Sequence, residues 1–177
     1  SAATIIISSA SALSAEDVEK PDPYGQTTKE YLSQFKAVGG KTFVYERYDA
    51  KSALVSRDVK PMSGSVGITS ATERSINGVT YRLRGLRSCP NAKVTYEAEE
   101  WDCEIAAVDY SAAVYGRASV FLCKTLVVKS ISGKNDPASC FALLGLGNSV
   151  EPYMVYNDDD SMVFLGLADI GKNDASQ

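Results

Sequence analysis

The chain has 177 residues, a formal net charge of −4 and no histidine. An acidic balance argues against a surface that binds duplex nucleic acid, because such surfaces are usually basic. Without histidine, Ser-His-Asp and Cys-His catalytic devices are excluded, and a zinc site would need all four cysteines as its ligands. We therefore expect no enzymatic activity, no cofactor and no metal site.

Residues 1–23 are predicted to be an N-terminal extension and linker. Its Ala/Ser-rich start contains Ile5, Ile6 and Ile7 in a row, which would reduce solubility unless something covered them. We expect these isoleucines to bind another protein subunit; the alternative is the remnant of a targeting segment that lacks its positively charged region. No apolar run approaches the roughly 18 residues of a membrane-spanning helix, so we expect no transmembrane segment.

The next residues predict one amphipathic helix over 24–38. Asp22 and Pro23 supply a cap and a first-turn proline, and Gly39-Gly40 provides the end. The apolar residues of this segment recur at helical spacing: Tyr24, Tyr31, Leu32, Phe35 and Val38. We expect this helix to pack on a sheet.

From Thr42 onward the hydrophobic period changes from 3.6 to 2, which indicates strands. The predicted strands are 42–48, 53–59, 78–86, 92–98, 103–110, 113–122, 125–131, 140–146, 153–156 and 162–167. The short RSCPN turn predicts that 78–86 and 92–98 form a hairpin, and the unbroken apolar run at 140–146 predicts a strand buried on both faces. Residues 168–177 are predicted to be a C-terminal tail.

This pattern favours an all-β to α+β fold over residues 24–167. Many short strands with frequent turns are typical of a single antiparallel β-barrel or sandwich, of the lipocalin-like or OB-like type. A closed barrel would also remove exposed strand edges.

Four cysteines leave the redox state open. Cys89 with Cys103 and Cys123 with Cys140 could join neighbouring strands, but four cysteines allow three pairings, and four buried free thiols are equally compatible with the sequence. The compartment therefore stays open as well; a secreted or organellar location would suit disulfides, although the chain has no N-x-S/T sequon.

Basic residues gather around one predicted strand. Arg82, Arg84, Arg87 and Lys93 could bind phosphate, carboxylate or single-stranded nucleic acid, or they could be a solvated strand face that pairs with the acidic residues downstream. Acidic clusters occur at Glu97, Glu99, Glu100, Asp102 and Glu104, and at 157–161, where NDDDS could hold calcium. For both acidic clusters, a solvated hairpin turn is the simpler interpretation.

The string NGVTYRLRGLRSCP resembles the third strand and following turn of the staphylococcal-nuclease-like OB-fold family. In this resemblance Arg82 matches the family's strand arginine. Arg87 and Asn91 stand where the family has catalytic carboxylates, and the calcium motif is replaced by 63–65, Ser-Gly-Ser. The resemblance therefore implies an inactive nuclease-like module that binds nucleic acid.

The lack of catalytic chemistry and the long termini favour a non-enzymatic structural or assembly subunit, or a protein-binding module, within a larger complex. Two alternatives remain: the inactive OB-fold module, and a β-barrel carrier of a small apolar ligand. The carrier hypothesis depends on the supply of aromatic residues in the predicted strands, which are Phe43, Tyr45, Tyr81, Tyr96, Phe121, Phe141 and Phe164.

Overall fold

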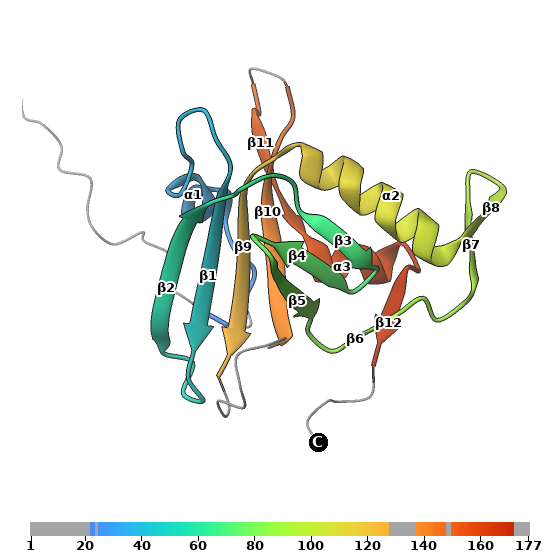
Figure 1. Ribbon diagram of the computed structural model, residues 1–177, viewed down its shortest axis with the longest axis horizontal. Helices are drawn as coiled ribbons and strands as arrows, with labels where there is room; N and C mark the ends of the chain where they lie inside the picture. Colours follow the sequence, from blue (N-terminus) through green and yellow to red (C-terminus); the bar gives the residue numbers. More distant parts are fainter. Residues whose placement is uncertain (1–21, 24, 128–136, 148–149, 172–177) are drawn as a thin grey trace, which may run out of the picture.

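The computed structural model describes residues 22–23, 25–127, 137–147 and 150–171. An eight-stranded mixed sheet dominates it, in the order β2-β1-β9-β10-β5-β4-β3, with β11 also paired to β10 (Figure 1). These strands are β1 (Thr42–Tyr48), β2 (Leu54–Pro61), β3 (Gly67–Ser70), β4 (Glu73–Ile76), β5 (Val79–Leu83), β9 (Ala118–Leu126), β10 (Pro137–Gly145) and β11 (Tyr153–Asn157). Two small ribbons pair β6 (Leu86–Ser88) with β12 (Ala168–Ile170), and β7 (Lys93–Tyr96) with β8 (Glu99–Asp102). The helices are α1 (Lys29–Ser33), α2 (Cys103–Gly116) and α3 (Asp158–Phe164).

The prediction of an antiparallel barrel, lipocalin-like or OB-like, is wrong. The sheet is not closed, and it is mixed, because β1 runs parallel to β9 and β10 runs parallel to β5. Parallel neighbours cannot be joined by a tight turn, so the chain between β1 and β9 makes most of the other elements before it returns. The period-2 pattern locates strands in the sequence but carries no information about which distant strands pair.

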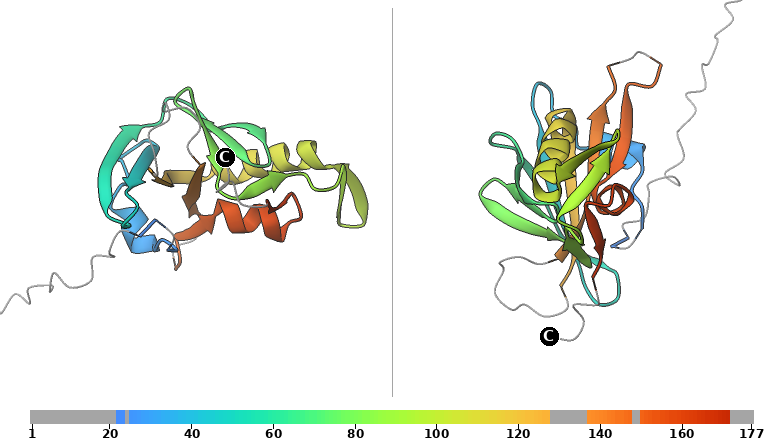
Figure 2. Two further views of the ribbon diagram at one scale, coloured as in Figure 1. Left: turned by 90° about the horizontal axis from the view of Figure 1, so that it is seen from below. Right: turned by 90° about the vertical axis from the view of Figure 1, so that its right-hand side faces the viewer.

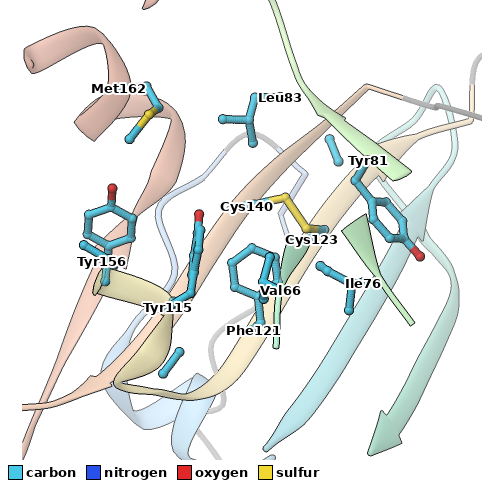
Figure 3. Packing of buried hydrophobic residues seen from close by; sticks show 14 of the residues in the cluster. Val66, Ile76, Tyr81, Leu83, Tyr115, Phe121, Cys123, Cys140, Tyr156 and Met162 are labelled. Carbon is cyan, nitrogen blue, oxygen red and sulfur yellow. A yellow bond between two sulfur atoms is a disulfide. The ribbon is translucent and has the colours of Figure 1, made fainter. Parts of the chain in front are cut away.

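The three central strands β1, β9 and β10 are buried on both faces of the sheet. On one face, Val120 and Leu122 of β9 pack with Tyr31 and Leu32 from the α1 region. On the other, Phe121 lies in the larger cluster beneath α2 and α3, which also contains the Cys123–Cys140 disulfide (Figure 3). The prediction that 140–146 is a strand buried on both faces is confirmed by β10.

The prediction of a single helix at 24–38 is also wrong. In the described part of the chain α1 covers only Lys29–Ser33, and its cap is Thr28, whose side chain accepts a hydrogen bond from the Tyr31 amide. Two further helices occur where strands and a hairpin turn were predicted: α2 occupies 103–116, and α3 occupies most of the NDDDS segment.

Helix α2 forms because its start is capped and its interior is rich in alanine. The Asp102 carboxylate accepts a hydrogen bond from the Ile105 amide, and Glu104 places a negative charge in the first turn, where the helix dipole favours it. Apolar residues occur all around this helix and make no single stripe, which explains why the periodicity did not reveal it.

The hairpin predicted between 78–86 and 92–98 does not exist. β5 pairs instead with β4 through the Asn77-Gly78 turn, both residues of which have positive φ, as a two-residue turn of this kind requires. β7 pairs with β8, and β6 pairs with β12. Residues 168–170 of the expected C-terminal tail are therefore part of a strand.

Candidate functional site

A groove of about 490 Å³ lies at one end of the molecule. It is formed where the β7–β8 hairpin, the first turns of α2 and the end of α3 meet, at the right-hand end in Figure 1. Most of the residues that line it are apolar or aromatic; they are Val94, Thr95, Tyr96, Trp101, Ala106, Asp109, Tyr110, Phe164, Leu165 and Leu167. The groove thus contains the only tryptophan of the chain.

The aromatic residues of the groove are unusually exposed. Phe164 is 89% exposed, Tyr96 is 62% exposed and Trp101 is 41% exposed. Burying one such side chain contributes about 1.5–3 kcal/mol, so three of them beside one hollow are a costly arrangement for a surface that contacts only water. Contiguous apolar patches of this kind commonly mark interaction sites.

The β7–β8 hairpin holds two of these rings in position. Val94 lies directly opposite Trp101 in the antiparallel register, and Tyr96 follows Val94 by two residues, so all three side chains lie on one face of the ribbon. The Cys89–Cys103 disulfide joins the residues just before β7 to the first residue of α2. The hairpin, which projects beyond the sheet in Figure 1 and in the left view of Figure 2, is therefore anchored at its base.

The rim of the groove is acidic. Residues 88–110 contain six carboxylates and a single basic residue, Lys93. Asp102 caps α2, and Glu104 accepts hydrogen bonds from the Ser88 hydroxyl and the Ala71 amide. These two carboxylates stabilise the local structure. Of the other four, Asp109 lines the groove, and Glu99 is opposite Tyr96 and so lies on the aromatic face of the ribbon.

The four basic residues predicted to bind an anion do not converge. The Arg84 side chain donates to the backbone carbonyls of Lys124 (3.0 Å) and Pro23 (3.4 Å). Arg87 forms an ion pair with Asp169. Arg82 and Arg87 do line one pocket, but Lys93 lies on the separate β7–β8 ribbon, opposite Asp102.

The NDDDS segment is the start of α3 and not a calcium loop. Asn157 is the helix cap, and Asp158 is fully buried in an ion pair with Arg74. Among the described residues no group of three or more potential ligands could hold a metal ion.

Two site predictions remain, those on the cysteines and on the N-terminal isoleucines. The structure contains two disulfides, Cys89–Cys103 and Cys123–Cys140, the pairings that would join neighbouring segments. Ile5, Ile6 and Ile7 lie outside the described residues.

Sequence reasoning missed the groove because its lining comes from three separate segments; the one available signal was a lone tryptophan among the carboxylates of residues 97–104.

No protein-family model matches the chain, and neither a curated protein nor a solved structure matches it significantly. Within the described ranges, no helix has the length and apolar character needed to cross a membrane.

Proposed function

We propose that this protein is a non-enzymatic binding module that docks a partner protein in the groove between the β7–β8 hairpin, α2 and α3. The observation that carries the proposal is the set of exposed aromatic side chains, Tyr96, Trp101 and Phe164, around one hollow. Aromatic residues dominate the energetics of protein interfaces because they bury a large area with few rotatable bonds.

The acidic rim determines the kind of partner. A segment that inserts an apolar or aromatic side chain and carries lysine or arginine on either side would bury the aromatic residues and face the carboxylates of the rim. An acidic segment would be repelled by Glu99 and Asp109. The partner is therefore a protein with an exposed basic segment built around an apolar anchor.

The two disulfides support a function outside reducing compartments, because such bonds persist in oxidising surroundings. The Cys89–Cys103 bond also stiffens the base of the groove, which lowers the entropic cost of binding. The carrier and OB-fold alternatives rested on an antiparallel β-barrel, and the open mixed sheet of the described residues gives them no support.

The test uses peptides selected from a random library displayed on phage, and Trp101 as a built-in reporter. We expect the selected peptides to share an aromatic or large apolar residue flanked by lysine or arginine. Titration should shift the emission of Trp101 to shorter wavelength as its indole leaves water. The affinity should fall as salt is added, since the flanking charges are exposed.

Two variants make this test specific. Phe164→Ala should weaken peptide binding by at least about tenfold, as expected for an aromatic residue central to an interface. Val55→Ala, which removes an exposed apolar side chain on the distant strand β2, should leave binding unchanged. Equal affinity of wild type and Phe164→Ala would refute the proposal, and so would selected peptides that are acidic. If the wild type dimerises and Phe164→Ala is monomeric, the groove binds a second copy of the chain, and the proposal of a partner with a basic segment is refuted.

A further inference from the structure

A second cleft, of about 240 Å³, lies at the opposite side of the core. It separates the β1–β2 pair from the β4–β5 pair, which are not neighbours in the sheet but face one another because the sheet curls. The ring of Tyr81 on β5 lies 5.2 Å from the ring of Phe43 and 5.1 Å from that of Tyr45, both on β1. These three buried rings form the floor of the cleft.

The hydroxyl of Tyr81 faces the cleft side of this cluster. In Figure 3 it is turned away from the Cys123–Cys140 disulfide, toward the side where β1 lies. Burial, together with the nearby Tyr45 hydroxyl, raises the pKa of Tyr81 to about 12, so the group is a neutral hydrogen-bond donor at physiological pH.

Three charged side chains line the wall of the cleft beside the floor. In the β1–β2 register Asp58 is directly opposite Tyr45, and Lys60 is directly opposite Phe43, so both lie on the same face as the rings. Arg47 follows Tyr45 by two residues on that face, and its guanidinium lies 5.3 Å from the centre of the Tyr45 ring. All three are exposed, and none forms an ion pair with another described residue.

The arrangement of these three charged side chains limits which kind of ligand the cleft can bind. A simple anion would be attracted by Arg47 and Lys60 but would meet Asp58 as a like charge. A simple cation would meet the two basic residues in the same way. A ligand with a carboxylate and an ammonium group satisfies all three, and an apolar ring on such a ligand fits the aromatic floor.

We propose that this cleft binds a small zwitterion with an aromatic ring, of the kind represented by a free aromatic α-amino acid. The carboxylate contacts Arg47 and Lys60, the ammonium contacts Asp58, and the ring packs on Tyr45, Phe43 and Tyr81. This site is independent of the proposed protein-docking groove, which is built from other elements.

The experiment compares four probes by calorimetric titration: L-phenylalanine, 3-phenylpropionate without the amine, phenethylamine without the carboxylate, and glycine without the ring. L-phenylalanine should bind saturably, and each of the other three at least about tenfold more weakly. Asp58→Asn should weaken L-phenylalanine and phenethylamine but not 3-phenylpropionate. Arg47→Gln should weaken L-phenylalanine and 3-phenylpropionate but not phenethylamine.

The controls are Lys51→Gln, an exposed change in the β1–β2 turn, and Phe164→Ala in the docking groove; both should bind L-phenylalanine as the wild type does. Because every substituted charge is exposed, folding should be unaffected. Absence of saturable binding by L-phenylalanine at about 10 mM would overturn the proposal. If 3-phenylpropionate bound more tightly than L-phenylalanine, the proposal of a zwitterionic ligand would be refuted. If Lys51→Gln weakened the binding of L-phenylalanine as much as Asp58→Asn or Arg47→Gln does, the proposed location of the site would be refuted.

Discussion

At the residue scale, the most demanding feature is a fully buried ion pair between Arg74 and Asp158. The Arg74 guanidinium donates to both carboxylate oxygens (2.9 and 3.0 Å) and to the Tyr115 hydroxyl (3.1 Å). It also donates to the backbone carbonyls of residues 70, 71 and 73, so its polar atoms are satisfied. The pair thereby joins β4 and its preceding turn to the start of α3.

Arg74→Met should destabilise the protein by about 3–5 kcal/mol, because it leaves the Asp158 carboxylate charged, buried and without its main partner. The measurement is the free energy of unfolding in urea. Arg87→Met is the matched control: it breaks the exposed pair with Asp169 and should cost no more than about 1 kcal/mol. Similar losses in the two variants would show that burial does not set the cost of losing Arg74.

Asp159, the next residue of α3, predicts a pH dependence. Burial, with a smaller effect from the neighbouring Asp158 charge, raises the pKa of Asp159 from 3.8 to about 7. The folded state therefore holds this proton more tightly than the unfolded state does. The contribution of Asp159 to the free energy of unfolding should therefore be greatest below pH 3.8, and it should be lost as the pH rises through about 7.

Asp159→Asn should flatten that part of the profile, since an amide does not titrate. Unfolding free energies measured between pH 4 and pH 8 decide the matter. Asp109→Asn, an exposed change on α2, should keep the slope of the wild type. A slope of the same size in Asp159→Asn would assign the pH dependence to another group.

At the scale of elements, the β7–β8 hairpin combines an unfavourable turn with two aromatic residues of the proposed docking groove. Its two turn residues, Glu97 and Ala98, have φ values of 49° and 66°. A two-residue turn needs this conformation to match the strand twist, but asparagine and glycine adopt it far more easily than glutamate and alanine do. The hairpin that carries Tyr96 and Trp101 is therefore less stable than the same hairpin would be with asparagine and glycine in its turn.

Ala98→Gly should raise stability by about 0.5–1 kcal/mol, because glycine adopts a positive φ without steric cost. Ala112→Gly, at an exposed position inside α2, should lower it by about 1 kcal/mol. The same Ala→Gly substitution should thus change the stability in opposite directions at the two positions, and thermal or urea unfolding measures both changes. Loss of stability in both variants would mean that the turn does not hold Ala98 in this conformation.

The sequence predicts those elements whose pattern is local. Residues 42–48 form β1 as expected, and 140–146 form the doubly buried strand β10, because alternation and an unbroken apolar run are direct consequences of burial on a sheet. α2 was missed because its apolar residues form no stripe, although Asp102 and the alanine-rich run were helix signals. The docking groove was missed because strand and helix pairing across more than 60 residues, from Tyr96 to Phe164, is invisible to local patterns.

At the scale of the whole molecule, the two disulfides stabilise different parts. Cys123 and Cys140 are opposite each other on β9 and β10, and both are fully buried in the core. Cys89 is partly exposed and lies at the base of the ribbon that forms the docking groove, where it is bonded to Cys103. Solvent and reductant can therefore reach one bond while the fold is intact and the other only when the core opens.

Mild reduction under native conditions should open Cys89–Cys103 first. Mass spectrometry after alkylation should find two modified thiols, at Cys89 and Cys103, while the sheet signal in circular dichroism is retained. The β7–β8 hairpin would then lose its anchor, so Trp101 emission should move to longer wavelength, and peptide binding should weaken without global unfolding. Cys89→Ala/Cys103→Ala should reproduce these changes, whereas Cys123→Ala/Cys140→Ala should lower the unfolding midpoint and leave the groove intact in the folded fraction. If Cys123 and Cys140 were alkylated first, the core between β9 and β10 would open more readily than the ribbon, and the difference in exposure between the two disulfides would not set their order of reduction.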